Sequence, residues 1–237
     1  SPQNANLLVL GTNNKLPLIL QEYNQYVAPG TQIYVVDDQF DHAYLPSCSN
    51  LDISVCSEQV TYELLEELLT DHYGNILLLN DDSTDSETSD SITLLRLIYL
   101  RDIADKSQRH FSITTEMRNA SNQNLAASAR VDDFVIGSNF IGLLMAQIAE
   151  NHKMLPLIHE LLNEEGCEFY MKSASQYVPL GVEVNGFVLA ESAARKGEVY
   201  VGYRKLSPIP QPVQVNMDKR EPLILNEGDL IVVIAEE

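Results

Sequence analysis

Residues Leu7–Asp38 read LLVLGTNNKLPLILQEYNQYVAPGTQIYVVDD and decide the fold. The first four residues form a short, continuously apolar run, as in a strand buried on both faces, and Gly11 follows where the chain must turn. Apolar residues then recur at helical spacing, with Pro17 placed where a first helical turn tolerates it. A second apolar run ends in Asp37 and Asp38. The stretch therefore predicts a βαβ unit whose helix N-terminus faces a site beyond Gly11.

The turn after the first strand carries only part of a dinucleotide fingerprint. That fingerprint is G-x-G-x-x-G, and here Asn13 and Leu16 stand at the second and third glycine positions. Asp37 lies 26 residues past Gly11, close to where a ribose-binding acid would stand. We therefore expect NAD(H) binding to be weak, and the alternative is that Asp37 and Asp38 simply end a strand in water. The candidate nucleotide or ligand-binding residues are Gly11, Thr12, Asn13, Asp37, Asp38 and Asn80.

Strand-like and helix-like segments alternate about five times up to residue 137, which predicts a Rossmann-like α/β fold with a doubly wound parallel sheet. A helix capped by Ser57, a helix ending near Asp102 and a short helix at 122–130 are expected within this part. Pro156 is expected to interrupt a helical crossover, and 184–194 is expected to be helical. We predict three parts: a Rossmann-like lobe at 1–138, a crossover or dimerisation element at 139–166, and a small α+β lobe at 167–237.

Residues 80–90 form an acidic loop into a helix, with five acids and no base. The loop follows an apolar strand, and ligands bind at the carboxyl edge of open α/β sheets. One interpretation is a divalent cation site, with Ca²⁺ favoured, made by Asp81, Asp82 and Asp85. The other is that Asp and Ser side chains cap the helix and favour its dipole.

Composition narrows the class of protein. A net charge of −19 argues against nucleic acid as a partner, because phosphate binding needs clustered Lys and Arg. The three cysteines stand in no metal-binding spacing and indicate a reducing compartment. No apolar run approaches the roughly 18 residues of a membrane span. A polar start without Met indicates that the sequence is part of a longer protein.

Several motifs, in their order along the chain, resemble the RCK (regulator of K⁺ conductance) or TrkA-type domain. They are the one-glycine βαβ, the Asp-Ser-Glu-Thr loop, the strand at 131–137 and the Gly-Asp turn at 225–234. The stretches at 26–30, 100–103 and 191–199 resemble the CASTOR/POLLUX (DMI1) type of ion channel and its bacterial relatives. The resemblance covers nearly the whole chain.

The resemblance implies a non-enzymatic regulatory module at the cytoplasmic face of a membrane, joined to a cation-channel pore that is not part of this sequence. Paired units, as homodimers, would build the gating ring of a tetrameric channel, and ion or nucleotide binding would bias the pore. Asp85 matches an acid that binds Ca²⁺ in a calcium-gated archaeal relative, whose two partner acids fall on Thr115 and Met117 here. The alternatives are an NAD(P)-dependent oxidoreductase and a soluble TrkA-like subunit of a K⁺ transporter.

Overall fold

The computed structural model describes residues 5–40, 45–69, 73–119, 122, 133–162 and 167–236. The chain divides into two compact units, Ser1–Glu150 and Asn151–Glu237, each with its own buried apolar clusters. The three-part division at residues 138 and 166 stays a prediction. Within the described residues, no helix combines the length and the hydropathy that crossing a membrane would require.

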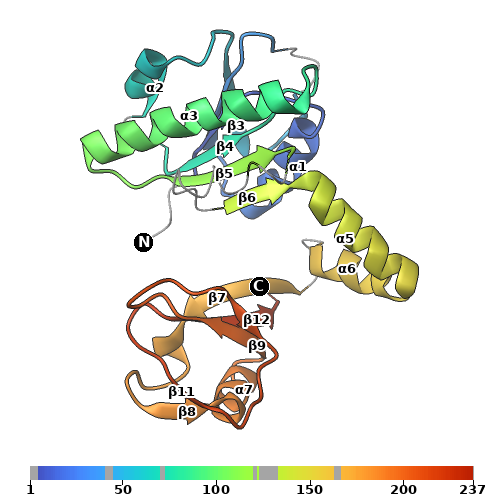
Figure 1. Cartoon of the computed structure of the whole chain (residues 1–237), viewed down its shortest axis with the longest axis vertical. Coiled ribbons are helices and arrows are strands. Elements are labelled where there is room, and N and C mark those ends of the chain that lie inside the picture. Colours follow the sequence, from blue (N-terminus) through green and yellow to red (C-terminus); the bar gives the residue numbers. More distant parts are fainter. Residues whose placement is uncertain are drawn as a thin grey trace. The chain divides into compact units, whose positions relative to one another are not determined.

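Six parallel strands form the sheet of the first unit, in the order β3-β2-β1-β4-β5-β6 (Figure 1). Their direction of connection reverses between β1 and β4, and an open α/β sheet leaves a crevice at the carboxyl ends of such a strand pair. This arrangement confirms the predicted doubly wound, Rossmann-like α/β fold. The strands are β1 Leu7–Leu10, β2 Thr31–Val36, β3 Leu51–Cys56, β4 Asn75–Leu78, β5 Ser112–Met117 and β6 Asp133–Ile136.

Helices cover both faces of this sheet, which explains why β1 is apolar at every position. Successive side chains of a strand point to opposite faces. Leu8 and Leu10 pack with α3 (Ser86–Ser107) and α2 (Tyr62–Leu68), whereas Leu7 and Val9 pack with α1 (Leu16–Tyr26). In Figure 1, α3 lies across the face of the sheet nearer the viewer. A fourth helix, α5 (Gly137–Glu150), begins directly after β6.

Two predicted helix boundaries of this unit are wrong. Thr61, and not Ser57, caps α2, because its hydroxyl accepts a hydrogen bond from the backbone N–H of Leu64 over 3.2 Å. α3 continues past Asp102 to Ser107, since Ile103 and Ala104 extend its buried stripe. Apart from Asn122, the helix predicted at 122–130 lies outside the described residues.

The second unit contains a small α+β fold, of the kind the sequence predicts, together with α6. An antiparallel sheet in the order β10-β9-β12-β7 stands beside a two-stranded sheet of β8 and β11, with α7 and a 3₁₀ turn at Ala174–Gln176 packed on the core. The elements are α6 Met154–Leu162, β7 Glu168–Ser173, β8 Glu183–Asn185, α7 Gly186–Ala194, β9 Val199–Arg204, β10 Gln214–Val215, β11 Pro222–Ile224 and β12 Leu230–Ala235.

Two expectations about helices near this unit need correction. The segment 184–194 is not all helix, because Glu183–Asn185 pairs as a strand with β11 and the Asn185 side chain then caps α7. Pro156 does not break a helix, since it lies in the first turn of α6, where its missing N–H costs nothing. The helical path is interrupted instead at residues 151–153, between α5 and α6.

One buried carboxylate stabilises the Gly228–Asp229 turn before β12. Asp229 is fully buried, and its two oxygens accept hydrogen bonds from the backbone N–H groups of Leu206 and Asn226, each over 2.8 Å. Gly228 has a φ of 90°, which favours glycine. The carboxylate therefore holds the turn and the loop at Leu206 together.

Candidate ligand-binding cleft

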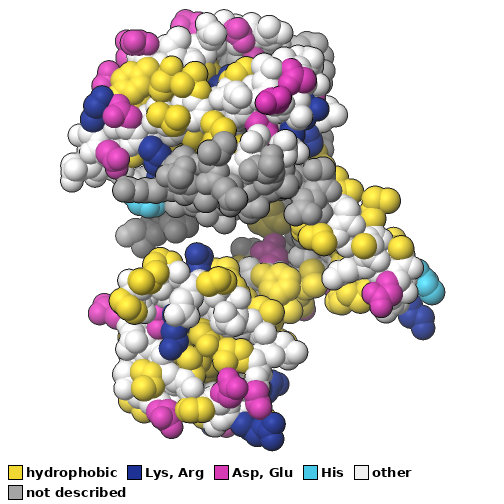
Figure 2. All heavy atoms as spheres, viewed as in Figure 1, with side chains coloured by type: hydrophobic (Ala, Val, Ile, Leu, Met, Phe, Trp, Pro, Cys, Tyr) yellow, Lys and Arg dark blue, Asp and Glu magenta, His cyan; other side chains and the backbone are white. Residues whose placement is uncertain are grey.

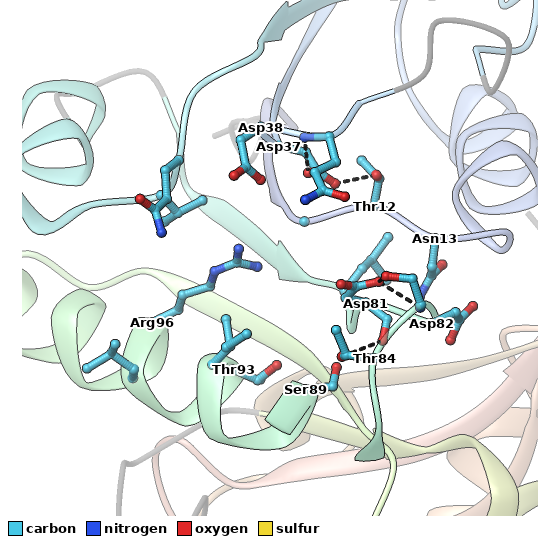
Figure 3. Close-up of a pocket in the computed structure, with 18 of the residues that line it drawn as sticks. Thr12, Asn13, Asp37, Asp38, Asp81, Asp82, Thr84, Ser89, Thr93 and Arg96 are labelled. Atoms are coloured by element: carbon cyan, nitrogen blue, oxygen red, sulfur yellow. Dashed lines mark hydrogen bonds between the residues drawn. The ribbon is translucent and has the colours of Figure 1, made fainter. Parts of the chain in front are cut away.

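A cavity of about 630 Å³ lies at the carboxyl edge of the parallel sheet, within the first unit. This volume is in the range of small-molecule sites. The predicted residues that line it are Gly11, Thr12, Asn13, Asp37, Asp38, Asp81 and Asp82 (Figure 3). Asn80 is buried beneath it, and Asp85 stands at the start of α3 instead. The structure thus brings together most of the residues that sequence spacing assigned to a ligand site.

Gly11 holds the floor of the cavity in a conformation that only glycine adopts easily. Its φ is +83°, and a Cβ built on it would lie 2.6 Å from the backbone oxygen of Leu79. The N–H of Gly11 donates to the carbonyl of Val36 over 2.9 Å, and the N–H of Leu79 donates to the carbonyl of Leu10 over 3.1 Å. The turn at Gly11 is therefore packed closely between the ends of β2 and β4.

The Asp37 carboxylate is held by hydrogen bonds from neighbouring residues of the protein. One of its carboxylate oxygens accepts a short hydrogen bond from the Thr12 hydroxyl, and the other accepts from the N–H of Gln39 over 2.9 Å. Asp38 follows it on the same rim of the cavity. Asp37 is half-buried and Asp38 is exposed, so the hydrogen bonds hold only Asp37 within the protein. A ligand role for the two acids stays a prediction, as does the alternative that they end a strand in water.

Asn13 uses the backbone groups that a phosphate would need. Its side-chain oxygen accepts from the N–H of Lys15 over 3.0 Å, and its carbonyl accepts from the N–H of Leu16 over 3.2 Å. Its side-chain nitrogen donates to the carbonyl of Asn80 and to the Glu116 carboxylate. The first turn of α1 therefore has fewer free N–H groups than a dinucleotide turn offers to a pyrophosphate.

The acidic loop is less isolated than its sequence suggests. Lys15 lies 3.6 Å from Asp82 and 3.0 Å from Glu116, so a base from α1's start reaches the loop. Arg118 donates from its guanidinium to the carbonyls of Thr84, over 2.7 Å, and Asp81, over 3.4 Å. The expectation of a loop without a neighbouring base is therefore wrong, because both bases come from distant parts of the chain.

The carboxylates proposed for Ca²⁺ have local hydrogen bonds. Asp81 accepts from the N–H and the hydroxyl of Ser83, and Asp85 caps α3 by accepting from the N–H groups of Glu87 and Thr88. Hydrogen bonds led by the Thr88 hydroxyl hold the pKa of Asp85 below its usual value. Among the described residues, no group of three His, Cys, Asp or Glu side chains is placed to hold a metal ion. Thr115 and Met117, at the positions of the archaeal relative's other two acids, are fully buried.

Sequence reasoning missed the buried network under the cavity. Asp90 is fully buried, and its oxygens accept four hydrogen bonds of 2.9 Å, from the side-chain nitrogens of Asn80 and Asn122 and the N–H groups of Arg118 and Asn119. This carboxylate joins the end of β4, the start of α3 and the loop after β5. An acid among the apolar positions of a helix is the signal that could have identified it.

Arg96 is the second residue that sequence reasoning missed. It lies in the middle of α3 and its side chain lines the cavity, extending toward the side opposite α3 (Figure 3). Burial lowers the pKa of its guanidinium, and the nearby carboxylates of Asp37, Asp38 and Asp81 partly offset this. Arg96 stands one position before the buried Leu97, and a base beside such an apolar stripe is a signal that could have identified it.

Comparison with solved structures identifies the fold. The gating ring of human SLO3 superposes with a TM-score of 0.62 at 12% sequence identity, covering 98% of this chain and 44% of that chain. At this identity the likeness concerns the fold alone, and the fold is that of an RCK-type gating-ring domain. No protein-family model matches the sequence.

Sequence relatives then identify the family of homologues. A probable ion channel POLLUX of Oryza sativa subsp. japonica is 27% identical over 201 residues, covering 73% of this chain and 21% of the relative. A probable ion channel CASTOR of the same plant is 23% identical over 272 aligned residues, covering 98% of this chain and 30% of the relative. The homologues of this chain are thus ion channels of the CASTOR, POLLUX and DMI1 type. The chain spans about a third or less of the length of these relatives.

Proposed function

We propose that this chain is the cytosolic, ligand-sensing regulatory domain of a cation channel of the CASTOR/POLLUX type. The observation that carries the proposal is the homology to ion channels over nearly the whole chain, joined to a gating-ring fold. The cavity at the carboxyl edge of the sheet supplies a place where a small ligand would act. Binding there would favour one arrangement of the domain and so bias a pore elsewhere in the same protein.

Self-association is the second part of the proposal. Four large apolar side chains of α5 are more than half exposed: Phe140, Ile141, Leu143 and Met145. Figure 2 shows hydrophobic side chains gathered on this helix. No described atom outside its own helix backbone and its chain neighbours lies within 4 Å of a Cβ built on Gly142, so the backbone there is open to close approach. A second copy of this chain is the partner that a gating-ring fold provides, and pairing through α5 would bury this surface.

An NAD(P)-dependent oxidoreductase is the weaker candidate. A dinucleotide enzyme places the pyrophosphate on free N–H groups at the first turn of α1, and here Asn13 takes two of them. The homologues are ion channels, which also favours a regulatory role over a catalytic one.

Bilayer recordings from the full-length protein that contains this chain test the proposal. Asp37→Asn alters the cavity rim and should change the open probability about fivefold or more, as in ordinary allosteric couplings. Asp52→Asn, at an exposed position of β3, is the matched control and should leave it unchanged. A full-length protein that conducts no cations, or one whose opening responds equally to both changes, would overturn the proposal.

A further inference from the structure

The guanidinium of Arg96 lies over the turn where a dinucleotide would place its pyrophosphate. Its Nη1 atom is 2.7 Å from the position that a Cβ on Gly11 would take. The side chain extends from the middle of α3 toward the turn at Gly11. Asp38 lies across the cavity from it and Asp81 to one side (Figure 3). A positive group from α3 therefore occupies the space that the glycine turn leaves open.

This guanidinium has hydrogen-bond donors to spare. An arginine carries five N–H donors. Within the described ranges, Asp37, Asp38 and Asp81 act on Arg96 through their charge, and no atom accepts a hydrogen bond from it. Burial has removed part of its water, so a group that accepts these donors would be bound favourably.

A second polar group in the same cavity has no hydrogen-bond partner among the described residues. Ser89 lies on α3 seven residues before Arg96, is 2% exposed, and its hydroxyl makes no hydrogen bond with any described group. The residue lines the cavity together with Arg96. Two helical turns separate Ser89 from Arg96, so both stand on the same side of α3 and can serve one ligand. A buried hydroxyl without a partner in a cavity is a group that a ligand can satisfy.

The charge around the cavity limits what Arg96 can bind. Four carboxylates line it, namely Asp37, Asp38, Asp81 and Asp82. Among the residues that the structure describes, only Asp82 has a base within 4 Å of its carboxylate, at Lys15. These acids repel every negative charge on a ligand, and the single positive charge of Arg96 can compensate only one of them. The amides that would share a second phosphate are occupied by Asn13. Hydroxyl or amino groups on the rest of the ligand would face Asp37 and Asp38.

We propose that Arg96 is the anion anchor of this cleft, and that the ligand is a small molecule with a single terminal phosphate or carboxylate rather than a dinucleotide. The inference rests on the ligand-sensing role proposed above and names the chemistry of that ligand. It does not depend on the pore, because anion binding is a property of the first unit alone.

The test is a titration of the 237-residue chain with inorganic phosphate, acetate, pyrophosphate and NAD⁺ as separate probes, at an ionic strength held constant with chloride. The readouts are the melting temperature and the NMR cross-peak of the Arg96 Nε–Hε group, assigned by its loss in Arg96→Gln. Phosphate or acetate should move this cross-peak and raise the melting temperature by about 3 to 6 °C at ten times the dissociation constant. The stronger of these two probes identifies the anionic group.

Arg96→Gln should abolish both effects, whereas Arg195→Gln, at the exposed C-terminal cap of α7, should keep them. The proposal is overturned if neither phosphate nor acetate produces a response, or if the response survives in Arg96→Gln. Tighter binding of pyrophosphate or NAD⁺ than of phosphate would overturn the choice of a single anionic group. No current is measured here, so a failure of anion binding leaves the channel assignment standing, and a protein without channel activity leaves the anion site standing.

Discussion

The side-chain nitrogen of Asn80 donates a hydrogen bond of 2.9 Å to Oδ1 of Asp90, and both side chains are closed to solvent. The Asn80 oxygen in turn accepts from the Thr93 hydroxyl over 2.6 Å. The end of β4 is thereby fixed to α3 at two points one helical turn apart. Because α3 also carries Arg96, this network sets the distance between the guanidinium and the strand ends that form the rest of the cavity.

Asp90→Asn should be strongly destabilising. The carboxylate accepts four hydrogen bonds, and an amide would turn one accepting oxygen into a donor facing other donors. We expect a loss of about 2 to 4 kcal/mol in the free energy of unfolding, measured by urea denaturation. Asp102→Asn makes the same change at a partly exposed position of the same helix, where water can replace the bonds from Tyr62 and Lys106, and should have a clearly smaller effect. Equal losses in the two variants would contradict the role given to Asp90.

Gly11→Ala and Gly30→Ala separate two reasons why a position requires glycine: a positive φ, and a backbone approach too close for a Cβ. Both residues have positive φ, +83° and +85°, but a Cβ on Gly30 would meet none of the described atoms within 4 Å. Gly30→Ala should therefore cost about 1 to 2 kcal/mol from backbone strain alone. Gly11→Ala adds a clash with the Leu79 carbonyl, and we expect a total of about 3 to 5 kcal/mol. Urea denaturation of the two variants measures the difference, and similar losses would show that the close approach to β4 does not matter.

Asp85→Asn should change the acid limb of the stability curve. Hydrogen bonds lower the pKa of Asp85 in the folded protein from its ordinary value of 3.8, and the largest effect comes from the Thr88 hydroxyl. The folded state therefore gains stability from this carboxylate above about pH 3.8 and loses that gain as the pH falls through the lower, folded pKa. Melting curves between pH 2 and pH 6 should show a difference between the parent and Asp85→Asn that is constant above pH 5 and shrinks below pH 4.

Glu87→Gln is the control for this cap, because it removes a charge from the same turn without changing the cap oxygens. Its melting temperature should follow the parent more closely across the acid range than that of Asp85→Asn. A difference between the parent and Asp85→Asn that does not depend on pH would show that the carboxylate's charge contributes nothing to the cap.

The parts of the fold that were predictable are those that local pattern encodes. The fully apolar β1 indicates a strand covered on both faces, and the structure places α1 and α3 on those two faces. The glycine after it and the acids after β2 were assigned to one site because parallel strands bring their carboxyl ends to one edge. Spacing along the chain was enough for this step.

The contents of the cleft were not predictable in the same way. Arg96 and Asp90 lie on a helix, and nothing in their neighbours in sequence says that they meet Gly11, Asn80 or Arg118. The loop at Asp81 and Asp82 was interpreted as having no neighbouring Lys or Arg. In the structure, Lys15, after β1, and Arg118, after β5, both contact it. Charge compensation of this kind depends on tertiary contacts, so a count of acids within one loop overstates the attraction for a cation.

Self-association through α5 is the last prediction. Leu143 and Met145 are 63% and 65% exposed on this helix, and such apolar surface on a chain with a gating-ring fold is suited to a second copy. Light scattering on the purified 237-residue chain should give a mass of about twice 26.5 kDa at high protein concentration. Leu143→Lys with Met145→Lys should shift the mass toward one chain, because burying two lysines at an apolar interface is unfavourable.

The control is Gln147→Lys, which adds one charge at a polar position of the same helix and should keep the dimer. Circular dichroism checks that both variants are folded. A parent that stays monomeric, or a dimer that the double variant leaves intact, would place the interface elsewhere.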